Sequence, residues 1–272
     1  MDCYAVFGSP IGQSKSPIIH RMFAQQLGQD LSYAAIEPAK DEFQRSISDF
    51  FAKGALGANV TAPFKLEAFN FASEVSQRAS LAGAVNTLKS LGDGKVLGDN
   101  TDGQGLVEDL CRQFGSISGL SILLLGAGGA ARGVIAPLFS AGVATICIAN
   151  RTEQKALDLA QKFESLGEVG ACSIEGLPKS DFDFLINSTS SSMTGDVPGI
   201  QASALENMRY AYDMFYQDRP TSLMQWIAQH NTNIQLSDGL GMLVAQAAES
   251  FYIWRGVRPN ITPVIETLRS HL

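Results

Sequence analysis

The chain has 272 residues, a formal net charge of −7 at pH 7 and a pI near 5.0. This acidic balance disfavours general binding to nucleic acids or anionic membranes, because both depend on dense Lys and Arg. The length allows roughly two domains that each bury a core. An aromatic content of 8% and a charged content of 17%, without low-complexity tracts, are typical of a soluble globular protein.

The four cysteines have no spacing typical of a metal or redox site. Because the first residues carry neither a basic nor an apolar export region, we expect a cytoplasmic protein with reduced thiols. His20, His230 and His271 are too few for a histidine-based metal site, and each is expected at the surface or at a helix end. No metal is predicted.

In the first hundred residues, short apolar runs alternate with helical patterns, which predicts an α/β domain with a mainly parallel sheet. Ser16 before Pro17 is a predicted helix N-cap. Two apolar runs flank Gly92-Asp93-Gly94, which predicts a β-hairpin. The predicted strands are 3–7, 32–36, 57–60, 85–90 and 96–98, and the predicted helices start at 17 and near 63 and span 40–53 and 104–114.

An apolar run at 120–125 then breaks into a glycine-rich turn before a helix. Gly126 permits the tight turn, Gly128 lets the backbone approach a pyrophosphate, and Ala131 keeps the helix against the sheet. The start of the helix offers free N–H groups and a positive dipole end to phosphates. The residues expected at the phosphates are Gly126, Ala127, Gly128, Gly129 and Ala130.

The next apolar strand, 142–149, ends at Asn150, Arg151 and Thr152. An NAD enzyme would carry Asp or Glu there for the ribose 2′-hydroxyl, whereas a guanidinium suits a 2′-phosphate. We therefore predict NADP as the cofactor. Lys155 is a second candidate cation, although Arg151 and Lys155, four residues apart, also fit a solvated helix face.

A membrane span is the alternative interpretation of this apolar region, because Arg132 is its only charge between residues 115 and 149. Its glycines, Pro137 and two β-like segments argue against a span. Further predicted elements are helices at 130–141, 153–166, 240–254 and from 263, and strands at 182–186 and 210–213. Residues 102–239 are thus predicted to form a Rossmann-type NADP-binding domain, and residues 1–101 with 240–272 a discontinuous substrate domain.

Four fragments of the first half place small polar side chains after strands or at helix starts, where ligands bind in α/β folds. These fragments are 14–17, 59–65, 84–87 and 98–103. Further fragments follow at 187–190, 212–216 and 241–248. In this order and spacing, and together with the nucleotide motif, they make nearly the whole chain resemble the NADP-dependent shikimate dehydrogenases.

This resemblance implies reversible reduction of 3-dehydroshikimate to shikimate with NADPH, a step in aromatic amino acid biosynthesis. It implies Lys65 and Asp102 as the catalytic residues, with Lys65 as the acid/base. The residues that it implies for substrate binding are Ser14, Ser16, Asn59, Thr61, Lys65, Asn86, Asp102, Tyr216 and Gln246. For the cofactor it adds Thr189, Ser190, Met214, Gly239 and Met242.

Elementary chemistry agrees with these assignments, because hydride transfer to a ketone builds negative charge on oxygen and needs a proton donor nearby. Asp102 would favour the charged ammonium of Lys65 and keep it aimed. Ordinary roles stay open at each position: a solvated lysine at 65, a helix cap at Asp102, a turn at Asn86, a core tyrosine at 216 and a surface amide at Gln246. Ser188 and Ser192 depart from the Ala and Gly that are common in the resembling proteins.

Three rival functions remain. A broader quinate/shikimate dehydrogenase using NAD would want an acid near position 151. A protein like glutamyl-tRNA reductase would not match the first hundred residues. A non-catalytic NADP-sensing protein would need the cofactor motif but not Lys65 and Asp102. The expected partner is a small-molecule substrate, without nucleic acid or membrane, in a monomer or homodimer.

Overall fold

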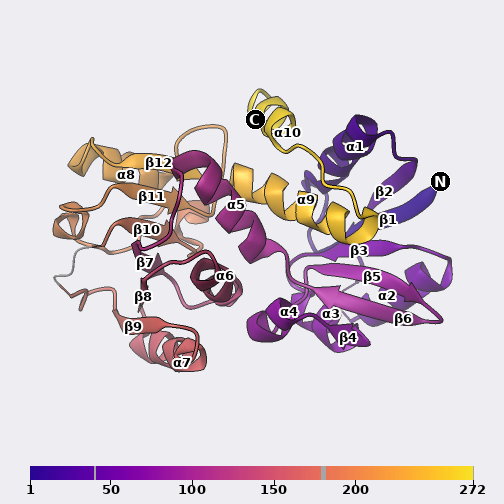
Figure 1. Cartoon of the computed structure of the whole chain (residues 1–272), viewed down its shortest axis with the longest axis horizontal. Helices are drawn as coiled ribbons and strands as arrows, with labels where there is room; N and C mark the ends of the chain where they lie inside the picture. Colours follow the sequence, from indigo (N-terminus) through magenta and orange to yellow (C-terminus); the bar gives the residue numbers. More distant parts are fainter. Residues whose placement is uncertain (40, 179–181, 272) are drawn as a thin grey trace. The chain divides into compact units, whose positions relative to one another are not determined.

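The computed structural model describes residues 1–39, 41–178 and 182–271, and the chain forms two compact units (Figure 1). Unit 1 comprises Met1–Gly105 and Val244–Leu268, and unit 2 comprises Leu106–Leu243 and the end of the chain from Arg269. The chain changes unit within three helices, α5 (Asp102–Phe114), α9 (Leu240–Arg255) and, at its last residue, α10 (Thr262–Arg269). The division predicted from the sequence places the first two changes four residues earlier, at 101 against 105 and at 239 against 243, and it keeps the end of the chain with the substrate domain.

Unit 1 contains a six-stranded sheet in the order β2-β1-β3-β5-β6-β4. Strand β1 pairs in parallel with β2 and β3, and β4 pairs in parallel with β6, whereas β5 is antiparallel to both of its neighbours. The predicted hairpin is confirmed as β5 and β6, and all three residues of its Gly92-Asp93-Gly94 turn have positive φ. The strands are β1 (Asp2–Phe7), β2 (Leu31–Ile36), β3 (Gly57–Val60), β4 (Glu74–Val75), β5 (Thr87–Gly92) and β6 (Lys95–Asp99).

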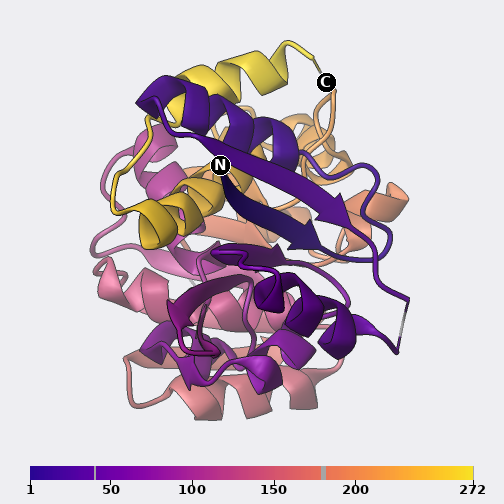
Figure 2. The ribbon, with the colours of Figure 1, turned by 90° about the vertical axis from the view of Figure 1, so that its right-hand side faces the viewer.

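Helices pack on this sheet through aromatic side chains. Residues of β1 alternate in direction: Phe7 packs edge-on against Phe43 of α2, while Tyr4 packs against Trp254 of α9, with ring centroids 4.7 Å apart. Figure 2 shows α1 running along β1 and β2. The helices with most of their residues in unit 1 are α1 (Ser16–Leu27), α2 (Phe43–Ala52), α3 (Lys65–Phe71), α4 (Gln77–Ala82) and α10 (Thr262–Arg269).

Two predicted helix starts are wrong. Ser16 is the first residue of α1 rather than its N-cap, which is Lys15 without a side-chain capping bond. Instead, the Ser16 N–H donates to the Ser14 hydroxyl at 3.3 Å. The helix predicted at 40–53 begins at Phe43, and its predicted first residue, 40, lies outside the described residues.

The prediction that His20 lies at the surface or at a helix end is also wrong. Its exposed fraction is 1%, and its ring stacks on Tyr33 with centroids 4.3 Å apart. Burial lowers the pKa of His20 to about 3, so the ring is neutral near pH 7. His20 shares the buried face of α1 with Ile19 and Phe23. His230 and His271 are exposed, as predicted.

Unit 2 contains a parallel six-stranded sheet in the order β12-β11-β10-β7-β8-β9. This is the doubly wound order in which the direction of winding reverses between β7 and β10, and ligands bind outside the carboxyl ends of the strands at that point. The strands are β7 (Ser121–Leu125), β8 (Thr145–Asn150), β9 (Glu168–Ser173), β10 (Phe184–Asn187), β11 (Tyr210–Asp213) and β12 (Gln235–Asp238).

Both faces of the unit 2 sheet are covered. Leu123 and Leu185 share a buried cluster with Ile227 of α8, while Phe184 packs edge-on against Phe114 of α5. In the described part of the chain, no helix is both long enough and apolar enough to cross a bilayer. The helices of this unit, besides parts of α5 and α9, are α6 (Gly129–Ser140), α7 (Glu153–Phe163), α8 (Ser222–His230) and the short 3-10 turns η1 (Ser191–Thr194) and η2 (Ala202–Leu205).

Candidate active site

In unit 1, Lys65 and Asp102 meet at the starts of two helices. Lys65 is the first residue of α3, and Asp102 is the first residue of α5, after the two-residue turn that follows β6. The Lys65 Nζ lies 2.5 Å from Asp102 Oδ2. The side chains are 32% and 20% exposed, so the pair is ordered by the protein yet open to a ligand. The charged pair that the proposed chemistry requires is therefore present.

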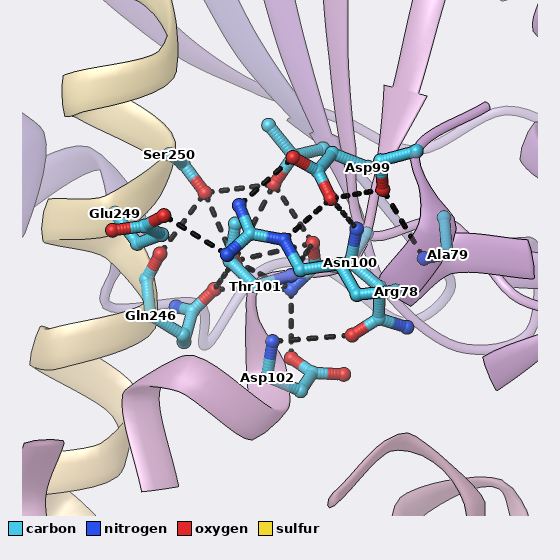
Figure 3. A network of polar contacts seen from close by, with 12 residues as sticks. Arg78, Ala79, Asp99, Asn100, Thr101, Asp102, Gln246, Glu249 and Ser250 are labelled. Carbon is cyan, nitrogen blue, oxygen red and sulfur yellow. Dashed lines mark hydrogen bonds and ion pairs between the residues drawn. The ribbon is translucent and has the colours of Figure 1, made fainter. Parts of the chain in front are cut away.

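Asn86 holds the same carboxylate from a second direction. Its Nδ2 donates to Asp102 Oδ1 at 2.7 Å, and its Oδ1 accepts from the Thr101 N–H at 2.9 Å. Asn86 thus bonds the β6–α5 turn rather than its own backbone, and the two oxygens of the Asp102 carboxylate accept hydrogen bonds from Asn86 and Lys65. Figure 3 shows this turn with Asp102.

Small hydroxyl side chains follow the carboxyl ends of β1 and β3. The Thr61 N–H donates to the Phe7 carbonyl at 2.9 Å, which joins the two strand ends. Gly8 is needed at this point because a Cβ there would lie 2.4 Å from Thr61 Cγ2. Ser14 and Ser16 stand at the start of α1, where the helix dipole favours an anion such as a carboxylate.

Asn59 differs from the other predicted substrate residues because its buried amide is already hydrogen-bonded to protein groups. It is 6% exposed; its Oδ1 accepts from Tyr33 Oη at 2.7 Å, and its Nδ2 lies 3.0 Å from Ser250 Oγ. Gln246 of α9 faces inward, because its Oε1 accepts from Asn86 Nδ2 at 3.4 Å. The connecting residues Tyr33 and Ser250 were missed, although Ser250 lies one helical turn after Gln246.

Tyr216 belongs to unit 2, in the segment after β11, whereas the other predicted substrate residues belong to unit 1. Burial raises the pKa of Tyr216, and the nearby charge of Asp238 raises it further. The phenol is therefore neutral and is able to donate a hydrogen bond at ordinary pH.

A cavity of about 700 Å³ lies at the carboxyl ends of the unit 2 strands. Gly126 turns out of β7 with φ +101°, and a Cβ there would lie 2.7 Å from Ser188 Oγ. Gly128 is the N-cap of α6, and a Cβ there would meet no protein atom within 4 Å. Its backbone therefore faces open space at a helix N-terminus, which fits a pyrophosphate.

Arg151 follows the last residue of β8, is exposed and lines this cavity. The turn is fixed because Asn150 Nδ2 donates to the Thr152 carbonyl at 2.8 Å. Lys155 is exposed on α7, outside the residues that line the cavity. Of the two predicted cations, Arg151 is thus better placed for a 2′-phosphate.

The loop after β10 supplies the other wall. Thr189 and Ser190 line the cavity, as expected for residues that contact a cofactor. Ser188 Oγ donates to the Leu125 carbonyl at 2.6 Å, and Ser192 Oγ donates to Asp213 Oδ2 at 2.5 Å. The two unusual serines therefore fasten the loop to its own sheet.

Met214, Gly239 and Met242 gather after β11 and β12. A Cβ at Gly239 would lie 2.0 Å from the Met214 carbonyl oxygen, so only glycine allows these two segments to approach. The Met242 N–H donates to Tyr212 Oη at 3.3 Å. Within residues 1–39, 41–178 and 182–271, no group of three or more His, Cys, Asp or Glu is arranged to hold a metal ion.

Comparison with known proteins covers most of the chain. Residues 6–88 match the shikimate dehydrogenase substrate binding domain, residues 109–211 match the family described as shikimate / quinate 5-dehydrogenase, and residues 239–269 match the shikimate 5′-dehydrogenase C-terminal domain. The shikimate dehydrogenase (NADP(+)) of Pseudoalteromonas atlantica is 53% identical over all 272 residues and is itself covered completely.

Solved structures agree. An Ael1 enzyme from Pseudomonas putida has 42% identity and a TM-score of 0.93, with 98% of each chain covered. Shikimate 5-dehydrogenase from Thermus thermophilus, solved in complex with NADP(H) and shikimate, has 29% identity and a TM-score of 0.87, with both chains covered completely. The chain is therefore a member of the NADP-dependent shikimate dehydrogenase family.

Proposed function

We propose that this enzyme reversibly reduces 3-dehydroshikimate to shikimate with NADPH, the step that the sequence predicts. The observation that carries the proposal is the Lys65–Asp102 pair at 2.5 Å, set among the hydroxyl and amide side chains of unit 1. A ring with a carboxylate, several hydroxyls and one ketone requires this mixture of a cation, an anion and fixed polar groups.

In the reductive direction NADPH supplies a hydride to the ketone carbon. The Lys65 ammonium donates a proton to the ketone oxygen as negative charge develops there. Asp102 keeps this ammonium aimed, while Asn86 fixes the carboxylate from its other side. Ser14 and Ser16 at the start of α1 are the proposed carboxylate site, and Thr61, Gln246 and Tyr216 are proposed partners of ring hydroxyls.

Asn59 is proposed to act mainly by holding Tyr33 and the strand ends, because its amide is already hydrogen-bonded within unit 1. The predicted substrate contact of Asn59 would require one of these bonds to be exchanged for a bond to the ligand. For the cofactor, Gly126 to Ala130 would hold the pyrophosphate and Arg151 the 2′-phosphate.

The test is an absorbance assay at 340 nm with purified protein, shikimate and NADP⁺, with parallel reactions containing NAD⁺ or quinate. Steady NADPH formation with shikimate, much faster than with NAD⁺, supports the proposal. Equal rates with quinate and NAD⁺ would support the broader dehydrogenase instead. Tight NADP⁺ binding without turnover of either acid would make the protein a cofactor-binding module and refute the proposal.

A further inference from the structure

Arg78, the second residue of α4, joins two carboxylates that belong to different elements of unit 1. Its Nε and Nη2 donate to the two oxygens of Asp99 at 2.7 and 2.8 Å, which is a bidentate fork. Its Nη1 donates to Glu249 Oε1 of α9 at 3.0 Å. Figure 3 shows the guanidinium between these two side chains.

The cluster is largely shielded from water. The side chains of Asp99, Glu249 and Arg78 are 10%, 11% and 27% exposed. Burial alone would raise the pKa of Asp99, but the hydrogen bonds and charge of Arg78, together with hydrogen bonds from Ser76 and the Asn100 N–H, lower it. Arg258 approaches Glu249 Oε2 at 2.7 Å and supplies a second positive charge. Removing Arg78 would leave a buried carboxylate without its main partner, which is costly.

Asp99 is connected to the catalytic carboxylate through the β6–α5 turn. Its Oδ1 accepts from the Asn100 N–H at 2.7 Å, and the Asn100 side-chain oxygen accepts from the Asp102 N–H at 3.2 Å. Asp99 and Asp102 are only three residues apart, so the fork on Asp99 fixes the backbone from which Asp102 extends toward Lys65.

Glu249 connects the same guanidinium to the helix that carries Gln246. The two residues are three apart on α9 and therefore share a face of the helix. Gln246 Oε1 reaches Asn86 Nδ2 and Thr101 Oγ1 at 3.4 and 3.5 Å, which are long contacts that a small rotation of the helix would break. One side chain thus braces both the turn with Asp102 and the helix with Gln246.

We propose that Arg78 is a positioning residue for the reaction, an inference that rests on the proposed function. It acts through Asp99 on the Lys65–Asp102 pair and through Glu249 on Gln246. The sequence patterns did not single out Arg78, because its partners follow it by 21 and 171 residues.

Mutations can separate the two contacts of Arg78, one with Asp99 and the other with Glu249. Arg78→Gln removes both, and we expect kcat with shikimate to fall by about 10- to 100-fold, since a small displacement of a catalytic group has that effect. The KM for shikimate should rise several-fold, while the KM for NADP⁺ stays within about twofold. Arg78→Lys keeps the charge without the fork and should recover stability more fully than kcat.

Glu249→Ala removes the contact of Arg78 with α9, together with the Arg258–Glu249 ion pair, and keeps the fork on Asp99. We expect a several-fold rise in the KM for shikimate with a kcat within about threefold of wild type. This variant and Arg78→Lys carry the test if Arg78→Gln does not fold.

Arg255→Gln is the matched control. Arg255 is another ion-paired arginine of unit 1, with Asp2 and Gln29 as partners near the end of α9. Its replacement should lower the melting temperature and leave both shikimate parameters unchanged. If Arg78→Gln and Arg255→Gln lose kcat in the same proportion to their loss of melting temperature, Arg78 is only structural and the proposal is overturned.

A crystal structure of Arg78→Gln supplies a readout that does not depend on turnover. The proposal expects Lys65 Nζ and Asp102 Oδ2 to separate or lose their alignment relative to wild type, and an unchanged pair with unchanged kcat would overturn it. Failure of the wild-type protein to oxidise shikimate with NADP⁺ would instead refute the proposed function, and that result is obtained before any variant is made.

Discussion

At the scale of single residues, the candidate site is built around two opposite charges that lie within hydrogen-bond distance of each other. Lys65 and Asp102 are 37 residues apart in sequence, yet their charged atoms lie 2.5 Å apart. Asn86 completes the pair by bonding the second carboxylate oxygen. In the proposed reaction, this arrangement would orient the proton donor before the substrate arrives, so that little reorganisation is needed.

Replacing Lys65 should therefore affect the chemical step. For Lys65→Ala we expect kcat to fall by about 100-fold or more with little change in the KM for shikimate, since proton transfer matters most in the transition state. Steady-state kinetics at 340 nm measure both values, with exposed Lys95→Ala as the control. A large rise in KM with kcat intact would make Lys65 a binding residue only.

Arg151 provides a second prediction at this scale. Because a charged hydrogen bond contributes about 1.5–3 kcal/mol, Arg151→Ala should reduce the preference for NADP⁺ over NAD⁺ by roughly ten- to a hundredfold. The ratio of kcat/KM for the two cofactors reports this change. Lys155→Ala, outside the lining of the cavity, should change the ratio much less. Equal effects of the two substitutions would contradict the assignment of the 2′-phosphate to Arg151.

At the scale of elements, the position of α9 on the unit 1 sheet depends on one glycine. The Trp254 indole Nε1 donates to the Leu88 carbonyl at 2.9 Å, and its ring packs on Tyr4. A Cβ at Gly57 of β3 would lie 2.4 Å from that Nε1. The absence of a side chain at position 57 is thus what lets the helix lie this close to the strand.

Gly57→Ala should accordingly displace Trp254 and destabilise unit 1 by about 1–3 kcal/mol, the usual cost of overpacking a core. Urea unfolding followed by tryptophan fluorescence measures the change. Gly12→Ala is a suitable control, because a Cβ at Gly12 would meet nothing within 4 Å. If the two variants unfold at the same urea concentration, the close packing at Gly57 does not limit the position of α9.

At the scale of the whole molecule, His20 connects the packing of unit 1 to pH. Its ring lies among Phe23, Tyr33, Phe251 and Trp254, and burial holds its pKa at about 3. A folded-state pKa below the unfolded value, about 6.5, means that the unfolded chain binds more protons between these values. The stabilising contribution is therefore complete above about pH 6.5 and is lost as the pH falls toward 3.

We expect the free energy of unfolding of wild type to decrease with falling pH more steeply than that of His20→Phe. The difference in slope should be about 1.4 kcal/mol per pH unit between roughly pH 4 and 6, because one proton is taken up on unfolding. Chemical denaturation at several pH values measures both slopes. Parallel curves for the two proteins would show that His20 is protonated in the folded state.

The sequence patterns predicted some of the buried strands, such as β3 and β11, at their observed bounds. They missed β4, which has two residues, and the two edge strands of the unit 2 sheet, β12 and β9, of which β9 carries Glu168 and Gly170 at exposed alternating positions. Short and exposed strands bury too little apolar surface to leave a clear periodic signal. Their pairing partners stabilise them, and pairing is not a local property.

The nucleotide motif was determined by the sequence alone. The roles proposed for Gly126, Gly128 and Arg151 depend on local backbone conformation and charge just after β7 and β8. The burial of His20 and the bridge from Arg78 to Asp99 and Glu249 were decided only by the tertiary structure. The physical reason is that burial and ion pairing depend on distance in space. Arg78 and Glu249 are 171 residues apart in sequence, and neither periodicity nor local propensity indicates a contact over such a separation.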